Sequence, residues 1–175
     1  MDILSSFTHC SNCGWRYAEQ RWPRKCGKCE AVVFRNPIPV GVAIQPVGAK
    51  RDLLAGKPLR LLAVRRAIEP QKGGVALPGG FHDFGESWQR NICRELEEEL
   101  GVITEPSWVT LFDYHSTPNG SQNVVFGLLP AIREEDLPPF AANREVAERL
   151  LIDESDVLCF STHQSVAAAY FRGRR

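Results

Sequence analysis

Residues 80–102 read GFHDFGESWQRNICRELEEELGV, and this stretch decides how the rest of the chain is interpreted. Apolar residues recur at every fourth position along it, at Trp88, Ile92, Leu96 and Leu100. Such a stripe is typical of an amphipathic helix with one buried face. Gly101 follows at the point where a helix commonly ends. We therefore predict a helix over residues 86–100 that packs against a core.

The same helix carries four glutamates. Glu95, Glu98 and Glu99 are spaced i, i+3 and i+4, which places them on one face, whereas Glu97 points away from them. Like charges on one exposed face repel by roughly a few tenths of a kcal/mol per pair, so a cation between the carboxylates would explain the cluster. Oxygen ligands suit Mg²⁺ or Mn²⁺ better than zinc or copper. A solvated acidic face is the alternative that the cluster by itself leaves open.

Nine positions of the stretch follow one known pattern: Gly80, Glu86, Arg94, Glu95, Leu96, Glu98, Glu99, Gly101 and Val102. Through them the chain resembles the Nudix hydrolases, a family with an α/β/α sandwich fold that hydrolyses nucleoside diphosphates linked to another group. The resemblance implies that Glu95, Glu98 and Glu99 hold Mg²⁺ or Mn²⁺. It also implies that Glu98 or Glu99 acts as the catalytic base and that Glu86 and Arg94 form an ion pair, which fixes the loop against the helix.

Further candidate residues lie outside this helix. Glu148 resembles an acidic residue that many family members carry in a later loop, and it is a second candidate for the base; an exposed loop acid is the alternative. Arg65 and Arg66 end an expected strand, where an arginine can donate two hydrogen bonds to a substrate phosphate; a solvated pair is the alternative for at least one. Gly79 and Gly80 either let the backbone approach the metal or phosphate or form a plain turn.

Four of the six cysteines form two Cys-x-x-Cys pairs near the start of the chain, namely Cys10 with Cys13 and Cys26 with Cys29. This spacing is typical of a zinc ribbon, in which both pairs bind one tetrahedral Zn²⁺. Buried or disulfide-linked cysteines are the alternative. However, so short and polar a segment has little core of its own and needs a cross-link to hold it together. We predict a structural zinc ribbon over residues 1–35.

An extended joint is expected at Asn36-Pro37-Ile38-Pro39, because proline biases the preceding residue away from helix. The second domain would then cover residues 36–175. In it we predict strands at 40–47, 60–66, 109–114 and 123–129, a hairpin loop at 48–58 and a closing helix at 163–172. The stretch 145–151 resembles the late strand of the Nudix family, and the resemblance implies a further strand there. Strands interleaved with few helices indicate an α+β or α/β sandwich. The resemblance narrows this fold class to an α/β/α sandwich.

Composition and charge exclude several classes of protein. Apolar residues make up 43% and charged residues 24% of the chain, which is normal for a globular protein rather than a disordered or fibrous one. Lys plus Arg and Asp plus Glu both number 21, so bulk charge does not hold this chain to nucleic acid or anionic lipid. No membrane helix and no secretory signal are recognised, and a cytoplasmic protein with reduced cysteines is expected.

The four-cysteine ribbon, the joint and the box together resemble the zinc-ribbon branch that includes NADH, FAD and ADP-ribose pyrophosphatases. The NADH enzymes usually carry a Ser-Gln-Pro-Trp-Pro-Phe-Pro segment, whereas residues 121–126 read SQNVVF. The resemblance therefore favours a small nucleotide substrate of the FAD or ADP-ribose class, with AMP released.

Three other functions stay open. The first is an RNA- or protein-binding ribbon with a vestigial box, and the second is a nucleotide sensor that does not cleave its ligand. The third is removal of a nucleotide cap from RNA, and for an enzyme capped RNA is the one nucleic-acid partner considered. No membrane partner is expected, and the oligomeric state is open, a homodimer included.

Overall fold

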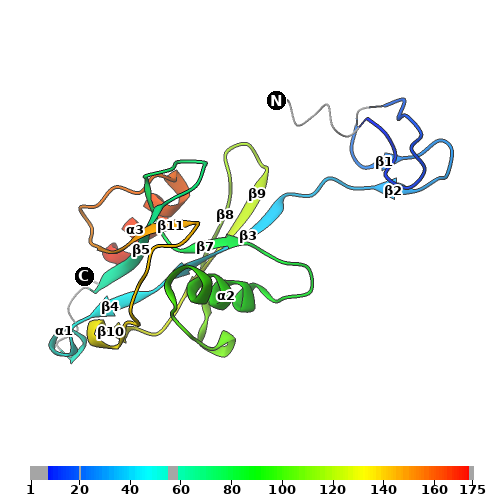
Figure 1. The fold of residues 1–175 in the computed structure, drawn as a ribbon. Coiled ribbons are helices and arrows are strands. Elements are labelled where there is room, and N and C mark those ends of the chain that lie inside the picture. The colour runs from blue at the N-terminus through cyan, green and yellow to red at the C-terminus, as the bar shows by residue number, and fades with distance from the viewer. Residues whose placement is uncertain (1–7, 20, 55–58, 174–175) are drawn as a thin grey trace. The chain divides into compact units, whose positions relative to one another are not determined.

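The computed structural model describes residues 8–19, 21–54 and 59–173. The chain divides into two compact units, Met1–Pro37 and Ile38–Arg175 (Figure 1). The predicted boundary after residue 35 lies two residues before this division, and independent folding of the two domains stays a prediction. No helix in the described ranges combines the length and the apolar composition that crossing a membrane requires.

The first unit is a pair of turns joined by a short ribbon. Strand β1 (Arg24–Lys25) pairs antiparallel with β2 (Val32–Val33). Each Cys-x-x-Cys pair is followed by a residue with positive φ, Gly14 at 71° and Glu30 at 59°. Their backbone amides donate to the carbonyls of the first cysteine of each pair, at 2.8 and 3.0 Å. Both turns thereby curl their two thiols toward the same point.

The second unit contains two sheets. The first has the order β7 (Gly79–Phe81), β3 (Ile38–Ile44), β9 (Gln122–Leu128) and β8 (Thr110–Ser116), in which only β3 and β9 run parallel. The second has the order β10 (Ile132–Arg133), β4 (Pro46–Gly48), β5 (Arg60–Arg66) and β11 (Val146–Ile152). Strand β6 (Val75–Ala76) also pairs with β5.

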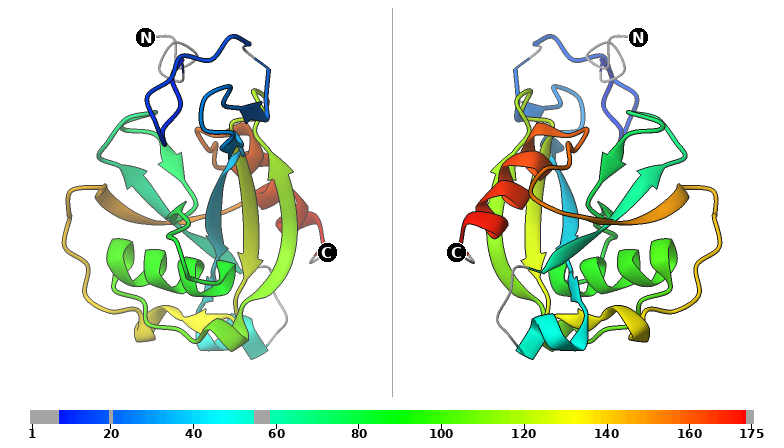
Figure 2. Two further views of the ribbon diagram at one scale, coloured as in Figure 1. Left: turned by 90° about the vertical axis from the view of Figure 1, so that its right-hand side faces the viewer. Right: turned by 90° about the vertical axis from the view of Figure 1, so that its left-hand side faces the viewer.

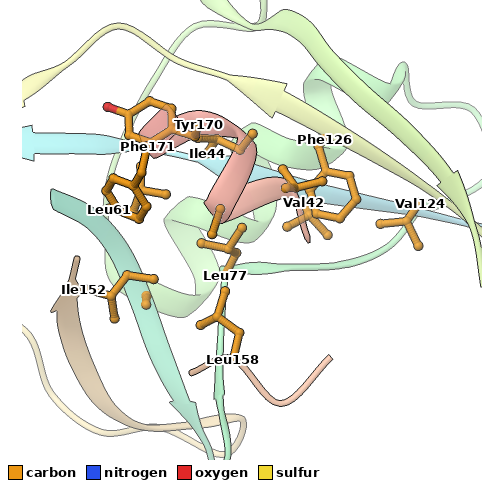
Figure 3. Packing of buried hydrophobic residues seen from close by; sticks show 13 residues of the cluster. Val42, Ile44, Leu61, Leu77, Val124, Phe126, Ile152, Leu158, Tyr170 and Phe171 are labelled. Carbon is orange, nitrogen blue, oxygen red and sulfur yellow. The ribbon is translucent and has the colours of Figure 1, made fainter. Parts of the chain in front are cut away.

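Two helices cover opposite sides of these sheets (Figure 2). Helix α2 spans Trp88–Leu100 and α3 spans Ser161–Arg172. In β5, Leu61 and Ala63 belong to the core cluster that contains α3, whereas Leu62 and Val64 belong to the cluster that contains α2. This alternation follows from the two-residue period of a strand. Figure 3 shows the cluster on the α3 side, and the arrangement is the expected α/β/α sandwich.

The ends of α2 depend on two local signals. The Ser87 side chain accepts a hydrogen bond from the Arg90 amide at 3.2 Å, so the helix begins at Trp88 rather than at Glu86. Gly101 ends it with φ of 69°. The other predicted strands and the closing helix are confirmed, with ends that coincide or are shifted by at most two residues.

The single strand predicted at 40–47 is wrong. The chain forms β3 and β4, which belong to different sheets and are separated by Gln45. The buried Gln45 side chain donates to the carbonyls of Pro46 and Pro130 at 3.0 and 2.8 Å, which satisfies the backbone where it leaves one sheet. The apolar residues on both sides of Gln45 and Pro46 hide this break in the sequence. The loop predicted at 48–58 contains helix α1 (Lys50–Leu54), and residues 55–58 lie outside the described part of the chain.

Two short 3₁₀ helices complete the second unit, at Pro106–Trp108 and Glu134–Asp136.

Candidate active site

Arg94 is the centre of the polar network on helix α2. Its Nη2 donates to Glu86 Oε1 at 2.9 Å, and its Nη1 donates to Glu95 Oε1 at 2.8 Å and Glu98 Oε2 at 3.0 Å. Nη2 also donates to the Phe81 carbonyl at 2.9 Å. The predicted Glu86–Arg94 ion pair is thus present, and hydrogen bonding to Arg94 lowers the pKa of Glu86. One guanidinium holds the loop, strand β7 and two glutamates in fixed positions.

The loop between β7 and α2 has further ties to this network. Glu86 Oε1 accepts a hydrogen bond from the Asp83 amide at 2.8 Å, and Asn91 Nδ2 donates to the Phe81 carbonyl at 2.8 Å. These bonds close the loop onto the first turn of the helix, so the backbone next to the glutamates is rigidly placed.

The three glutamates of the predicted metal site differ in their exposure. Glu95 and Glu99 are 6% and 7% exposed, whereas the Glu98 side chain is 60% exposed. Burial raises the pKa of Glu99 to about 8 and also raises the pKa of Glu95. The Gly79 amide donates to Glu99 Oε2 at 3.0 Å. Ionising two carboxylates in a site that excludes water costs free energy, and a bound cation would stabilise their charged forms.

The glycines before the helix make room for protein groups. A Cβ on Gly80 would lie 2.6 Å from the Glu95 carboxylate, and a Cβ on Gly79 would lie 2.2 Å from the Gly41 carbonyl oxygen. Gly79 also has φ of 153°, which L side chains rarely adopt. These two positions therefore need glycine in order to seat Glu95 and pair β7 with β3. Their predicted contact with metal or phosphate stays a prediction.

A cavity of about 400 Å³ lies along this face of α2. Its polar lining includes Arg66, Gly79, Gly80, Arg94, Glu95, Glu98, Glu99 and Glu145, and its apolar lining includes Val42, Leu77, Val124 and Phe160. Three of these apolar residues, Val42, Leu77 and Val124, appear in Figure 3 within the core cluster under α3. The cavity therefore has acidic residues from α2 and apolar residues from the sheet and its connecting segments.

The two arginines at the end of β5 face different surroundings. Arg66 lines the cavity, where its Nε donates to the Pro70 carbonyl at 2.8 Å and its guanidinium lies 5.2 Å from the centre of the Phe160 ring. Arg65 Nε donates to Glu148 Oε2 at 2.8 Å. Neither Arg65 nor Glu148 is among the residues that line the cavity. Neighbouring residues of a strand point to opposite faces, so only Arg66 can reach the cavity.

Glu145 lies at the cavity instead of Glu148. It comes just before β11, and Asn143 fixes its position. Asn143 Nδ2 donates to the Glu99 carbonyl at 3.1 Å, and Asn143 Oδ1 accepts from the Glu145 and Val146 amides at 3.0 and 2.8 Å. The carbonyls at the end of α2 are thereby tied to the segment that carries Glu145. The sequence pattern points to this segment, but an asparagine before a strand is too common a signal to single out Asn143.

His163 of α3 also lines the cavity. It is 8% exposed, and its Nδ1 accepts a hydrogen bond from the Leu77 amide at 3.2 Å. Burial, with a further contribution from Arg66, lowers the pKa of His163 to about 3. His163 is therefore neutral at neutral pH and supports the Leu77 backbone rather than supplying a proton.

The ribbon cysteines have the geometry of a metal site. Their four Sγ atoms all lie within 4.8 Å of one another, with Cys10–Cys29 and Cys13–Cys26 separations of 3.7 and 3.6 Å. Tetrahedral Zn–S bonds of about 2.3 Å place sulfurs about 3.8 Å apart. All four cysteines are free, so the disulfide alternative is not realised. Asn12 Nδ2 donates to Cys29 Sγ at 3.5 Å and lowers the pKa of Cys29 to about 6.

Among the described residues, these cysteines are the only group of three or more potential ligands gathered this closely. The carboxylate oxygens of Glu95, Glu98 and Glu99 are further apart. Arg94 holds Glu98 through the i, i+4 ion pair, so Glu98 must turn from Arg94 to share an ion with Glu99.

Known proteins resemble this chain in sequence and in fold. The family model of the NUDIX domain matches residues 53–159. An ADP-ribose pyrophosphatase of Methanocaldococcus jannaschii is 37% identical over 68 residues, which span 39% of this chain and 39% of that relative. The match therefore covers less than half of the relative's length.

Two solved structures share the fold. A NUDIX hydrolase from Nitrosomonas europaea superposes with a TM-score of 0.73 at 22% identity, covering 95% of this chain and 92% of that one. The NUDIX domain of Shewanella oneidensis NrtR, solved in complex with ADP ribose, superposes with a TM-score of 0.61 at 20% identity, covering 81% and 90% of the two chains.

Proposed function

This chain belongs to the NUDIX domain family, and on that premise we propose that it hydrolyses the pyrophosphate bond of a nucleoside diphosphate linked to a second group. The proposed substrate is an ADP-ribose-like molecule, and AMP is one product. The observation that carries the proposal is the set of three α2 glutamates along a cavity of about 400 Å³ with an apolar opposite side.

Mg²⁺ or Mn²⁺ fits the residues of this site. Glu95 and Glu99 offer hard oxygen ligands that are more than nine-tenths buried, and the pKa of each is raised by that burial. Ion binding would stabilise their charged forms, and the exposed Glu98 can complete the set. When bound, such an ion polarises a phosphoryl oxygen and lowers the pKa of a coordinated water.

The protein's own groups have separate tasks in the proposed reaction. Arg66 donates to a substrate phosphate, because its guanidinium lines the cavity while its Nε is held by Pro70. Glu98 or Glu99 accepts a proton from the attacking water, and Glu145 is the candidate from the later segment. The water oxygen forms a bond to one phosphorus as the bridging P–O bond breaks, and the second phosphate leaves with the bridging oxygen.

Glu86 and Arg94 act in this proposal as positioning residues. Arg94 touches Glu95 and Glu98 directly, and Glu86 holds Arg94 from the loop. Loss of either one would release the glutamates from their shared orientation without removing a ligand. Glu148 would have to leave its ion pair with Arg65 to take part, so the proposal does not rely on it.

The choice of substrate is supported by the relatives. The relative from Methanocaldococcus jannaschii is an ADP-ribose pyrophosphatase, and the NrtR domain is complexed with ADP ribose. The sequence SQNVVF at residues 121–126 differs from the Ser-Gln-Pro-Trp-Pro-Phe-Pro segment that NADH pyrophosphatases usually carry. We therefore place ADP-ribose first, ahead of FAD and NADH.

A structural Zn²⁺ at Cys10, Cys13, Cys26 and Cys29 completes the proposal. It is supported by the four Sγ atoms lying within 4.8 Å of one another, with two of their separations close to those around tetrahedral zinc.

Parallel assays of ADP-ribose, FAD, NADH, diadenosine polyphosphates and capped RNA, with products identified by chromatography, test this function. We expect AMP release from ADP-ribose that depends on Mg²⁺ or Mn²⁺. Glu98→Gln should lower kcat by orders of magnitude, while Glu97→Gln on the exposed side of the same helix should not. Tight Mg²⁺-dependent binding of ADP-ribose without AMP release would instead identify a nucleotide sensor.

A further inference from the structure

A second cavity, of about 390 Å³, lies wholly within the first unit. Four of the residues that line it are basic, namely Arg16, Arg21, Arg24 and Lys25, and one is acidic, Glu19. Cavities of this size accommodate small ligands, and the surplus of positive charge suits an anion. We call this feature the ribbon cavity. Neither the fold of the second unit nor the proposed hydrolysis accounts for it.

The basic side chains of the ribbon cavity differ in their availability. Arg24 is 5% exposed and its guanidinium lies over the Trp22 ring at 4.2 Å and the Tyr17 ring at 5.3 Å, which indicates a structural role. Lys25 pairs with Glu30 at 3.4 Å on the surface, where such pairs are weak. Arg16 and Arg21 are exposed and have no ion-pair partner among the described residues. These two can therefore meet a ligand's phosphates.

Trp15 adds an aromatic surface to the same cavity. It is 51% exposed, and the small core of this unit is formed without it by Cys10, Tyr17 and Cys26. The Lys28 ammonium lies 5.7 Å from the centre of the Trp15 ring. A large exposed aromatic ring that is flanked by cations and is not needed for the core is suited to stack on a planar base.

We propose that the ribbon cavity binds single-stranded nucleic acid, with Arg16 and Arg21 on backbone phosphates and Trp15 stacked on a base. Basic grooves with interleaved aromatic rings bind single strands in this way, because every base offers a flat face. A duplex is excluded, since its bases are already stacked on one another. The overall charge of zero does not oppose the proposal, because the contact is local.

The zinc–thiolate centre sets a limit on this attraction. Four thiolates around one Zn²⁺ carry two negative charges, and the ribbon's basic side chains offset them. Binding should therefore be moderate and strongly dependent on salt, with a slope of about −0.7 in log K against log salt for each phosphate contacted.

Fluorescence anisotropy of a labelled RNA strand of about eight nucleotides, with the zinc-loaded full chain, tests the proposal. We expect saturable binding at low salt, a DNA strand of the same sequence bound within a few-fold, and much weaker binding of the duplex. Arg16→Gln with Arg21→Gln should weaken binding at least tenfold and reduce the salt slope by about 1.4. Trp15→Ala should weaken binding by about tenfold without changing the slope.

Lys50→Ala with Lys72→Ala is the matched control, because it removes two exposed charges from the second unit, and it should bind like the unaltered chain. Two further measurements separate the loss of a contact from the loss of the fold. The zinc content of each variant shows whether its ribbon is intact, and the double variant Arg16→Lys with Arg21→Lys, which keeps both charges, should retain binding in the anisotropy assay. Excess ADP-ribose should not displace the strand. The proposal is overturned by absence of binding at low salt, by equal binding of the duplex, by displacement with ADP-ribose, or by unchanged affinity in the glutamine pair.

Discussion

Raising the pH from 6.5 to 8 should destabilise the second unit in the absence of Mg²⁺ and Mn²⁺, because Glu99 loses a proton in a buried site. Burial raises the pKa of Glu99 from its ordinary 4.5 to about 8. Between these values the folded chain retains a proton that the unfolded chain has released. Its stability therefore falls as the pH rises through this window.

His163 has the opposite effect at lower pH. Burial lowers its pKa from 6.5 to about 3, so between these values the unfolded chain binds a proton that the folded chain does not. The contribution of His163 to stability therefore rises with pH up to 6.5. The two effects oppose each other between pH 4.5 and 6.5, and the Glu99 effect alone remains from pH 6.5 to 8. At about 1.4 kcal/mol per pH unit, that interval corresponds to about 2 kcal/mol of unfolding free energy.

Urea unfolding monitored by circular dichroism at the helix band is the appropriate assay. Every helix described in the structure belongs to the second unit, so this signal reports on that unit alone. With an m-value of about 2 kcal/mol per molar urea, the midpoint should drop by about 1 M between pH 6.5 and 8. Zinc-loaded protein freed of excess metal is required, and added Mg²⁺ should remove the drop.

Glu99→Gln should abolish the pH dependence between 6.5 and 8, because the amide has no proton to release. Glu97→Gln, which alters an exposed side chain on the same helix, should leave it unchanged. A midpoint that stays constant over this range in the unaltered chain, or that still drops in Glu99→Gln, would refute the role assigned to Glu99.

Three further outcomes are expected. Arg94→Ala should lower the unfolding free energy by about 2–4 kcal/mol, because it leaves the carboxylates of Glu86 and Glu95 without their partner; Arg90→Ala in the same urea assay should stay within about 0.5 kcal/mol of the unaltered chain. Gly80→Ala should weaken Mn²⁺ binding in calorimetry at least tenfold with little change in the urea midpoint, because its Cβ would displace the Glu95 carboxylate; unchanged Mn²⁺ affinity would contradict this. Strong chelation should remove about one zinc per chain and unfold the ribbon while the helix band is retained; a zinc-free sample with paired cysteines would contradict the ribbon assignment.

Local signals account for what could be predicted about the site. The apolar stripe, Ser87 and Gly101 act within a few residues of one another, so the helix and its ends follow from neighbouring positions. The Glu86–Arg94 pair is also local, because both residues lie on the loop and helix of one short stretch. The cysteine pairs are similar, since two residues between thiols suffice to form each turn.

Errors arose where the outcome depends on distant segments. The apolar residues on both sides of Gln45 and Pro46 do not reveal that the chain changes sheet at Gln45, because the residues next to the break are buried in both strands. Glu148 has an acidic side chain in the right segment, but the strand register directs it to Arg65. Glu145 reaches the cavity because Asn143 binds the end of a helix that lies over forty positions earlier in the chain.

The sequence by itself determined the family pattern, the acidic helix and the four-thiol centre, since each is written in residues close together along the chain. Only the tertiary structure decided that Glu95 and Glu99 are buried while Glu98 is exposed to solvent. It also decided that Arg66 rather than Arg65 faces the cavity. The physical reason is desolvation. Water is excluded from a carboxylate by whatever packs on it, and here that is a strand and a loop whose positions the spacing within the helix does not specify.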